Sequence, residues 1–261
     1  MRQHISSKNL VVLDARSRGA YSKAHIPGAR NADLFHYFVP GTDPKNLALF
    51  NRDLASKLGH LGIAGNERAI VYESGFGMRA PRVAWMLEYA GLRSPLILEG
   101  GFRAWKDSKY PIEKNRNPLK TTEFEIHPNL KVLATAGYVR SLTANGGIVL
   151  DVRSEEEFEG TENRECCPRA GRVPGALWFE WINFLDGDGR FEGRRLLDKR
   201  LRSLGVSKAS EIGVYCHRGA RAAAAFYALR SMGYHRARNF VGSWHEWSSK
   251  KSLPVETETT S

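Results

Sequence analysis

A cysteine, a histidine and two arginines fall within one short segment, Cys216-His217-Arg218-Gly219-Ala220-Arg221. The apolar run Ile212–Tyr215 before it predicts a strand, and the alanine-rich chain from Ala220 to about Met232 predicts a helix. A loop that leads from a strand into a helix directs backbone N–H groups and the positive end of the helix dipole at one point. Such a site, with basic neighbours, lowers the pKa of a thiol below its free value of about 8.5. The segment therefore predicts that Cys216 is a thiolate nucleophile.

The remaining residues of this loop are the candidates for substrate binding. Basic side chains in a first helical turn oppose the helix dipole, so Arg218 and Arg221 indicate an anionic ligand. The alternative is a small buried thiol beside the solvated surface of a helix start, with His217 on the rim. The expected substrate-binding set is His217, Arg218, Gly219, Ala220 and Arg221.

The other two cysteines, Cys166 and Cys167, are adjacent in a polar loop at residues 161–170. No Cys-x-x-Cys motif and no Cys/His spacing of a zinc site accompanies them. Three cysteines cannot form a disulfide framework. We therefore expect Cys166 and Cys167 to be non-catalytic, and we expect no metal and no organic cofactor.

The sequence contains two copies of one unit. The Asp-x-Arg motif at Asp14 recurs at Asp151, each time after an apolar run, and the Pro-Gly-Ala motif at Pro27 recurs at Pro174. Further pairs are Ile70-Val-Tyr72 with Gly213-Val-Tyr215, Gly101-Phe-Arg-Ala-Trp105 with Ser243-Trp-His-Glu-Trp247, and Tyr110-Pro-Ile-Glu113 with Leu253-Pro-Val-Glu256. Their nearly constant offset indicates a duplication, in which Glu73 occupies the position of Cys216.

Each copy alternates short β-branched runs with segments of helical period, which is typical of parallel βαβ units. The predicted strands are 11–13, 70–72, 96–98, 148–150 and 212–215, and a helix is predicted over Pro81–Ala90, ending at Gly91. An extra amphipathic segment, Leu133–Leu142, precedes the first strand of the second copy and predicts an opening helix for it. The polar, aperiodic chain around Pro118 predicts a linker. We therefore expect domains at 1–113 and 129–261, joined by a linker at 114–128.

Composition excludes several classes of protein. The chain has 261 residues, with 39 Lys and Arg against 28 Asp and Glu, so its net charge is +11. These basic residues are dispersed rather than clustered with aromatics, which argues against a nucleic-acid partner. No apolar stretch approaches the roughly 20 residues of a membrane span, and no secretory signal is visible. We expect a cytoplasmic protein without a membrane partner.

Together these motifs resemble the tandem-domain rhodanese family, the thiosulfate and 3-mercaptopyruvate sulfurtransferases. The resemblance implies two α/β domains, each a parallel five-stranded sheet flanked by helices, of which the first is inactive with an acidic residue, here Glu73, at the cysteine position. It also implies that the second domain moves a sulfane sulfur from a small anionic donor to cyanide or a thiol through a persulfide on Cys216. We expect a monomer, with thiosulfate as the donor because Arg218 and Arg221 favour a dianion.

Three alternatives remain open at this point. The donor could be 3-mercaptopyruvate. The fold is shared with Cdc25-type phosphatases and arsenate reductases, but their Cys-x5-Arg loop is one residue longer than the spacing from Cys216 to Arg221. A non-catalytic rhodanese-like binding module is the third alternative. Glu157, four residues after Arg153, is expected to pair with that arginine on one helix face.

Overall fold

The computed structural model describes residues 9–114, 118–186 and 190–257, and within it the chain forms two compact units. Unit 1 comprises the described residues up to Tyr37 together with Ala48–Leu130. Unit 2 comprises Phe38–Leu47 and the described chain from Lys131 onwards. Segment 38–47 therefore groups with unit 2, although it precedes the expected linker in the sequence.

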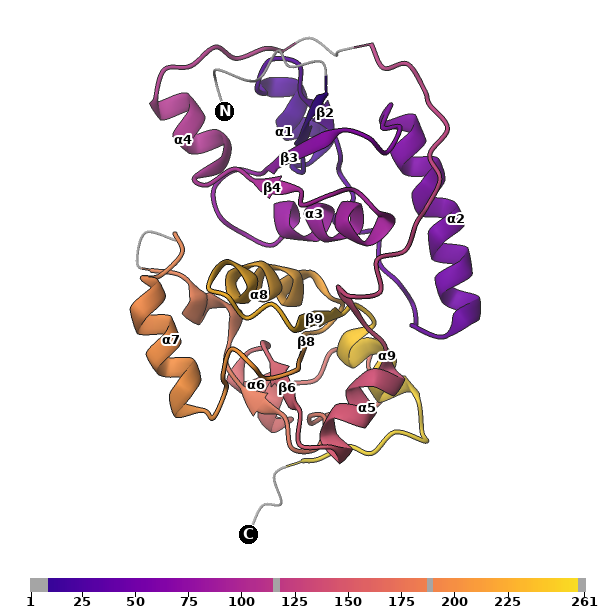
Figure 1. Cartoon of the computed structure of the whole chain (residues 1–261), viewed down its shortest axis with the longest axis vertical. Helices are drawn as coiled ribbons and strands as arrows, with labels where there is room; N and C mark the ends of the chain where they lie inside the picture. Colours follow the sequence, from indigo (N-terminus) through magenta and orange to yellow (C-terminus); the bar gives the residue numbers. More distant parts are fainter. Residues whose placement is uncertain (1–8, 115–117, 187–189, 258–261) are drawn as a thin grey trace. The chain divides into compact units, whose positions relative to one another are not determined.

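Unit 1 is built on a parallel sheet of four strands, with the order β2-β1-β3-β4. Helix α3 lies against one face of this sheet, and α1 and α4 lie against the other (Figure 1). The strands are β1 (Leu10–Asp14), β2 (Arg30–Asn31), β3 (Arg68–Tyr72) and β4 (Leu96–Ile97), and the helices are α1 (Arg18–Lys23), α2 (Pro44–His60), α3 (Arg79–Ala90) and α4 (Gly101–Asp107).

Unit 2 is built on a parallel sheet of five strands, with the order β5-β9-β8-β6-β7. Its strands are β5 (Leu133–Ala134), β6 (Ile148–Asp151), β7 (Leu177–Trp178), β8 (Ile212–Tyr215) and β9 (Ala237–Phe240). Its helices are α5 (Ala136–Ala144), α6 (Glu155–Glu159), the 3-10 helix η2 (Trp181–Phe184), α7 (Arg194–Ser203), α8 (Ala220–Ser231) and α9 (Ser243–Ser249).

The α/β class and the parallel sheets are confirmed, but the expectation of five strands in both domains is wrong for the described part of unit 1. The fifth strand of unit 2 is β5, an edge strand that comes from the chain before β6 and pairs with β9. In unit 1 the described chain begins at Asn9, next to β1, and β4 is the sheet edge. The amphipathic segment Leu133–Leu142 thus supplies both a strand and most of α5, where the sequence indicated a single helix.

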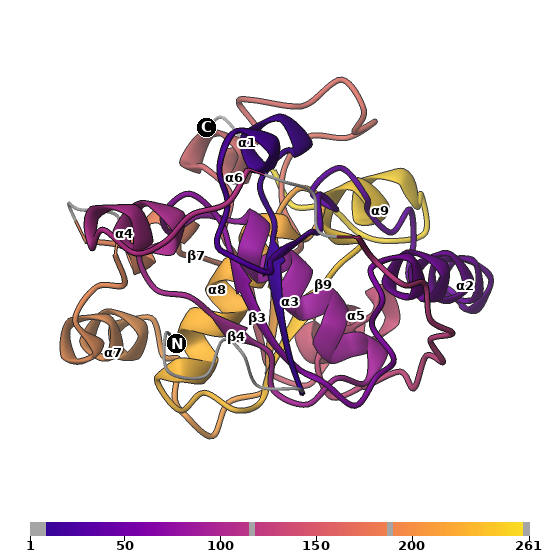
Figure 2. The same cartoon turned by 90° about the horizontal axis from the view of Figure 1, so that it is seen from above.

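Strand β8 lies at the centre of the unit 2 sheet, between β9 and β6. Its side chains alternate between the two faces. Gly213 and Tyr215 face α5 and α9, where Tyr215 joins a core that includes Trp244 and Trp247. Helix α8 covers the opposite face (Figures 1 and 2). The chain leaving β8 therefore enters α8 from the middle of a buried sheet.

The helices predicted beside the two loops are confirmed. Helix α3 ends at Ala90 and is capped by Gly91, whose φ of 112° lies in the left-handed region that glycine adopts without strain. Helix α8 ends at Ser231, close to the predicted end, and Gly233 has a φ of 97°. These glycines fix where both helices stop.

The duplication is visible in matching contacts. Asp14 accepts from the Arg16 guanidinium as Asp151 does from Arg153, with closest N···O distances of 2.5 Å and 2.6 Å, and all four residues are buried. The Tyr72 hydroxyl accepts from the Ile26 N–H at 3.1 Å, and the Tyr215 hydroxyl from the Val173 N–H at 3.2 Å. Each unit thus uses the same polar residues to join the end of its strands to the loops above them.

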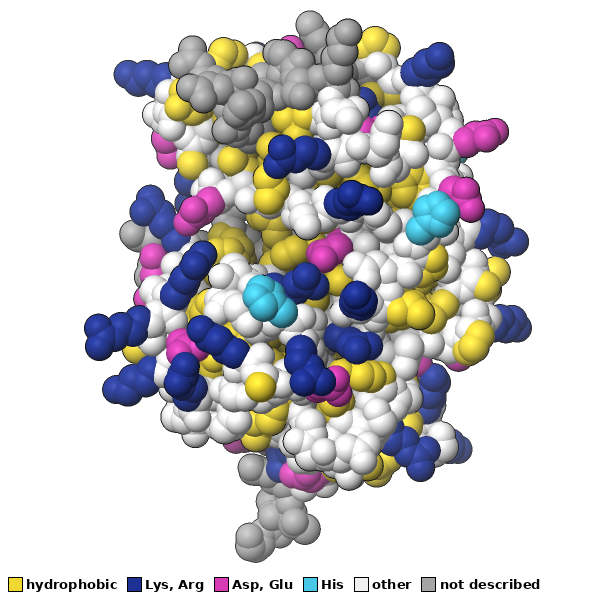
Figure 3. Space-filling model, in the orientation of Figure 1, with side chains coloured by type: hydrophobic (Ala, Val, Ile, Leu, Met, Phe, Trp, Pro, Cys, Tyr) yellow, Lys and Arg dark blue, Asp and Glu magenta, His cyan; other side chains and the backbone are white. Residues whose placement is uncertain are grey.

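The surface fits the dispersed charge of the sequence. Figure 3 shows Lys and Arg side chains spread over the visible face, with acidic and apolar side chains between them. Among the helices of the described residues, none has the length and apolarity needed to cross a bilayer.

Candidate active site

Cys216 is the first residue after β8, and its side chain is buried, with 1% of its surface exposed. The backbone N–H of Gly219 donates to the Cys216 Sγ at an N···S distance of 3.1 Å. Helix α8 begins at the next residue, Ala220, so the sulfur lies at the amino end of a twelve-residue helix. An N–H group and a helix N-terminus both stabilise negative charge on that sulfur.

Gly219 turns the chain from the cysteine into α8. Its φ of 78° is in the left-handed region, and a Cβ at this position would lie 2.8 Å from the carbonyl oxygen of Val241. The Gly219 carbonyl accepts from the Asn239 side-chain amide at 3.2 Å. Only glycine fits this close approach to the chain that follows β9, and the approach aims the Gly219 N–H at the sulfur.

Ser243, at the start of α9, is a contact of the cysteine to which the sequence analysis assigned no role. Its Oγ accepts from the Cys216 N–H at 3.1 Å, donates to the Phe240 carbonyl at 2.7 Å and lies 3.9 Å from the Cys216 Sγ. Its φ of 52° is unusual for a residue with a side chain. Ser243 follows the end of β9, and the carboxyl ends of neighbouring parallel strands meet at one edge of the sheet. That position is the one feature that could have indicated a contact with Cys216.

The backbone of α9 also holds the cysteine loop in place. The Trp244 N–H donates to the Cys216 carbonyl at 2.9 Å, and the His245 N–H donates to the His217 carbonyl at 3.1 Å. The first turn of α9 thereby satisfies two carbonyl groups that the turn leaves without strand partners.

Arg221 lies in the first turn of α8 and forms two hydrogen bonds with Glu157, at N···O distances of 2.6 Å and 2.9 Å. Burial of Glu157 favours its neutral form, but Arg221 and Arg164 outweigh burial and lower the pKa of Glu157 to about 2. The expected pair of Glu157 with Arg153 is therefore wrong, because Arg153 turns inward to the buried carboxylate of Asp151. The Glu157 pair fixes the Arg221 side chain beside the loop.

Arg218 lies over an aromatic ring. Its guanidinium carbon is 4.1 Å from the centroid of the Phe38 ring, a cation–π distance. Phe38 belongs to segment 38–47, which Thr42 attaches to unit 2 by donating to the Glu246 carboxylate at 2.8 Å and accepting from the Ala136 N–H at 2.9 Å. The ring orients the guanidinium within unit 2.

The His217 side chain contacts another cysteine of unit 2. Its Nε2 lies 3.2 Å from the Sγ of Cys166. Burial and the charges of Arg164 and Arg218 lower the pKa of His217 to about 4, so the imidazole is neutral at neutral pH. The structure thus brings a second thiol to the residue next to Cys216.

The fold and these contacts agree with what comparison with known proteins finds. A model described as "Rhodanese-like domain" matches residues 1–108 and again residues 135–250. The chain belongs to the rhodanese-like domain family. The second match contains Cys216 and the loop around it, and the first contains Glu73.

Relatives resemble the chain over nearly its whole length. A protein named probable 3-mercaptopyruvate sulfurtransferase from Pseudomonas aeruginosa is 31% identical, over 97% of this chain and 94% of its own. A thiosulfate sulfurtransferase from Azotobacter vinelandii is 28% identical, over 98% and 94%. The crystal structure of a probable thiosulfate sulfurtransferase has a TM-score of 0.77 at 34% identity, covering 95% of this chain and 98% of that one.

Glu73 is the counterpart of Cys216 in the first rhodanese-like match. Its carboxylate accepts from the Ala80 N–H at 2.8 Å, so it lies at the N-terminus of α3. Burial raises the pKa of Glu73, against the opposing effect of that N–H and of Arg79. The acid takes the place at the helix start that sulfur has in unit 2.

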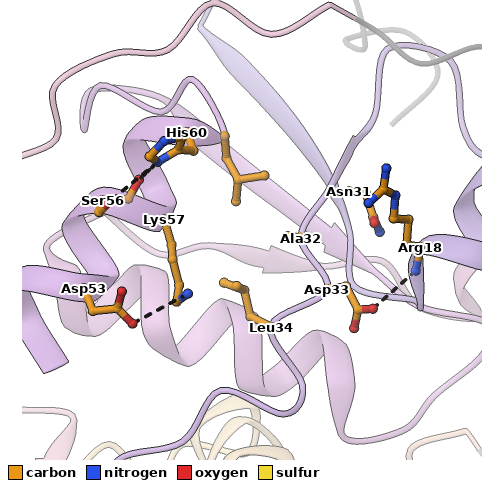
Figure 4. A pocket seen from close by; sticks show the side chains of 10 residues that line it. Arg18, Asn31, Ala32, Asp33, Leu34, Asp53, Ser56, Lys57 and His60 are labelled. Carbon is orange, nitrogen blue, oxygen red and sulfur yellow. Dashed lines mark hydrogen bonds and ion pairs between the residues drawn. The ribbon is translucent and has the colours of Figure 1, made fainter.

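Unit 1 also contains an open hollow between the chain after β2 and the second half of α2 (Figure 4). Polar groups around it bond to one another: Lys57 pairs with Asp53 at 3.6 Å, and the Arg18 N–H donates to Asp33 at 3.2 Å. Its lining includes neither Cys216 nor Glu73. The hollow is therefore separate from both of these residues.

Proposed function

We propose that this protein is a sulfurtransferase that carries sulfane sulfur as a persulfide on Cys216 and takes it from thiosulfate. Sulfur transfer is the activity in the names of the Pseudomonas aeruginosa and Azotobacter vinelandii relatives, and the preference for thiosulfate rests on the cysteine loop. The observation that carries the proposal is the buried Cys216 Sγ, 3.1 Å from the Gly219 N–H at the start of α8.

The first step is attack by the Cys216 thiolate on the outer sulfur of thiosulfate. A new S–S bond forms at cysteine, and the S–S bond of thiosulfate breaks, so that sulfite leaves with the electron pair. The negative charge then rests on the outer sulfur of the persulfide. The Gly219 N–H and the amino end of α8 favour an anion on Cys216 both before and after this step.

In the second step a thiophilic acceptor attacks the outer sulfur of the persulfide. The bond between the two sulfurs breaks, the acceptor leaves with the sulfane sulfur, and Cys216 returns as the thiolate. With cyanide as the acceptor, the product is thiocyanate. Neither step requires electrons beyond those of donor and acceptor.

We assign different roles to the two arginines of the loop. Arg221 is a positioning residue, since both terminal nitrogens of its guanidinium bond to the nearly buried carboxylate of Glu157. Arg218, oriented by the Phe38 ring, contacts the anionic donor. A charge-assisted contact of this kind is worth about 1.5–3 kcal/mol and favours the dianion thiosulfate over 3-mercaptopyruvate.

The test is side-by-side kinetics with the two donors and cyanide as the acceptor. Higher kcat/KM with thiosulfate supports the assignment. A clear preference for 3-mercaptopyruvate assigns the chain to that branch of the sulfurtransferases, and the absence of transfer from both donors favours a binding module instead.

A further inference from the structure

Three side chains with metal-ligating atoms meet beside the cysteine loop. The Sγ atoms of Cys166 and Cys167 and a ring nitrogen of His217 all lie within 4.8 Å of one another. Cys166 is exposed, Cys167 is buried and His217 is half-buried. In the sequence His217 follows the two adjacent cysteines by about fifty positions, so these residues do not form the short-spaced motif by which metal sites are found in a sequence.

The local chain brings both sulfurs to the same side. Adjacent side chains of an extended segment point in opposite directions. Here a turn replaces the extended chain: the Cys167 N–H donates to the Arg164 carbonyl at 2.8 Å, and the Asn163 side-chain amide donates to the Cys167 carbonyl at 2.8 Å. The turn therefore presents two thiols to one point, and His217 faces that point from the cysteine loop.

The turn is attached firmly to the rest of unit 2. Arg169 donates from its guanidinium to four backbone carbonyls at 2.7–2.8 Å. The indole N–H of Trp244 donates to the Arg169 carbonyl at 3.1 Å. The four carbonyls belong to Trp247, Ser248, Lys250 and Leu253. A cluster held on both sides by fixed backbone is pre-organised, which reduces the entropy lost when it binds a ligand.

We propose that Cys166, Cys167 and His217 form a binding site for a thiophilic divalent cation of the Zn²⁺ type. Zn–S bonds of about 2.3 Å and Zn–N bonds of about 2.0 Å in a tetrahedron separate the ligand atoms by about 3.5–3.8 Å, so closure from the present spacing requires small shifts. Exposed Cys166 leaves the fourth position open to water. The thiols release their protons on binding, and two thiolates then balance the charge of the cation.

Such a site would connect metal binding to the cysteine loop. His217 directly follows Cys216, and its carbonyl already accepts from the His245 N–H. A cation bound to the His217 ring and to the turn at Cys166 would hold the side chain of His217, in addition to the hydrogen bond that already holds its backbone. The binding itself does not depend on sulfur transfer, so it can be tested in a protein that lacks the catalytic thiol.

The experiment uses Co²⁺ as a spectroscopic probe on the full chain carrying Cys216→Ser, which removes the other nearby thiol. We expect one Co²⁺ per chain, with thiolate-to-cobalt charge-transfer bands that disappear on addition of Zn²⁺. Adding Cys166→Ser should weaken Co²⁺ binding by more than about 100-fold, because loss of a ligand exceeds the roughly 10–100-fold cost of losing an outer partner.

The matched control is His235→Ala on the same Cys216→Ser background. His235 is exposed and precedes β9, whereas Cys216 follows the end of the parallel strand β8, so the control lies at the opposite edge of the sheet from the cluster and Co²⁺ binding should remain within about twofold. Because Cys166 is exposed, Cys166→Ser should retain the fold, which circular dichroism checks. The absence of charge-transfer bands, or bands that persist unchanged after Cys166→Ser, would overturn the site.

Discussion

The loops after β3 and β8 are held by equivalent backbone hydrogen bonds, but they carry different side chains, a carboxylate at Glu73 and a thiol at Cys216. In unit 1 the Phe102 N–H donates to the Glu73 carbonyl at 2.7 Å, and in unit 2 the Trp244 N–H donates to the Cys216 carbonyl at 2.9 Å. Each loop leaves a buried central strand and leads to a helix start. The two copies thus share the strand, the loop and the backbone hydrogen bond that position the side chain of this residue.

The difference lies in what the helix start stabilises. In unit 1 the Glu73 carboxylate accepts from the Ala80 N–H, and α3 begins six residues after the acid. In unit 2 the sulfur accepts from the Gly219 N–H, and α8 begins four residues after the cysteine. A carboxylate placed there cannot hold a sulfane sulfur as a persulfide, whereas a thiolate placed there can accept a sulfur atom. The comparison predicts that chemistry is confined to unit 2.

The largest expected effect separates the two loops directly. Cys216→Ser should abolish transfer of sulfur from thiosulfate to cyanide, because a hydroxyl cannot form a persulfide. Glu73→Ala should leave kcat unchanged and alter only stability. Steady-state assays of both variants decide the matter, with Cys166→Ser and Cys167→Ser as controls that retain most activity. Substantial turnover in Cys216→Ser would remove the site assignment, and loss of kcat in folded Glu73→Ala would bring unit 1 into the chemistry.

The next largest effect is expected for the ion pair between Glu157 and Arg221, beside the cysteine loop. Glu157→Gln removes the charge that faces Arg221 and should lower the free energy of unfolding by about 3–5 kcal/mol, as for other broken buried pairs. Because the pKa of Glu157 falls from 4.5 to about 2 on folding, its stabilisation is complete above pH 4.5 and is lost as the pH drops toward 2. The wild type and the variant should therefore converge in that range in urea unfolding.

Arg164→Gln is the matched control for this pair. Its side chain is 47% exposed, and its Nε lies 3.2 Å from an oxygen of the same carboxylate. An exposed pair contributes about 0–1 kcal/mol, so this variant should unfold almost as the wild type does. Equal losses in Glu157→Gln and Arg164→Gln would contradict the role given to Arg221.

A smaller effect is expected for variants that alter how the cysteine loop recognises the sulfur donor. Arg218→Ala should raise KM for thiosulfate by one to two powers of ten, corresponding to about 1.5–3 kcal/mol, and raise it much less for 3-mercaptopyruvate. Phe38→Leu keeps an apolar contact but removes the ring under Arg218, and it should shift KM in the same direction by a smaller factor. Equal changes for both donors would show that Arg218 acts on the thiolate and not on the donor.

The smallest effect belongs to unit 1. Burial raises the pKa of Glu73, so the charged acid opposes folding, and this cost grows as the pH rises through its folded-state pKa. Glu73→Gln keeps the acceptor for the Ala80 N–H and removes the charge. It should therefore raise the free energy of unfolding at pH 7 on the order of 0.5–1 kcal/mol. If Glu73→Gln were less stable than the wild type at pH 7 and equally stable at pH 4, the charged form of Glu73 would favour folding, and this account would be wrong.

The repeats made much of the fold predictable. Apolar runs before Asp14 and Asp151 and glycines after the helices at Ala90 and Ser231 are local signals, and the structure has strands and helices there. The edge strands β5 and β7 have only two residues each, which is too short for a periodic pattern.

The site was predictable only where its residues are contiguous. The loop that follows β8 was visible in the sequence, but the contact of Ser243 with Cys216 requires β9 and β8 to be neighbours, which no local pattern gives. Helical spacing favoured Arg153 as the partner of Glu157, and the buried Asp151 carboxylate competed for it successfully. The meeting of Cys166 with His217 depends on a turn without periodicity.

The central claim, that Cys216 carries the sulfur, is tested most directly by mass spectrometry. Incubation with excess thiosulfate and no acceptor should leave a stable adduct heavier by one sulfur atom, confined to the peptide that contains Cys216. Cyanide should then restore the starting mass and release thiocyanate. An unmodified Cys216 after thiosulfate and after 3-mercaptopyruvate, or an adduct found instead on the peptide with Cys166 and Cys167, would contradict the account.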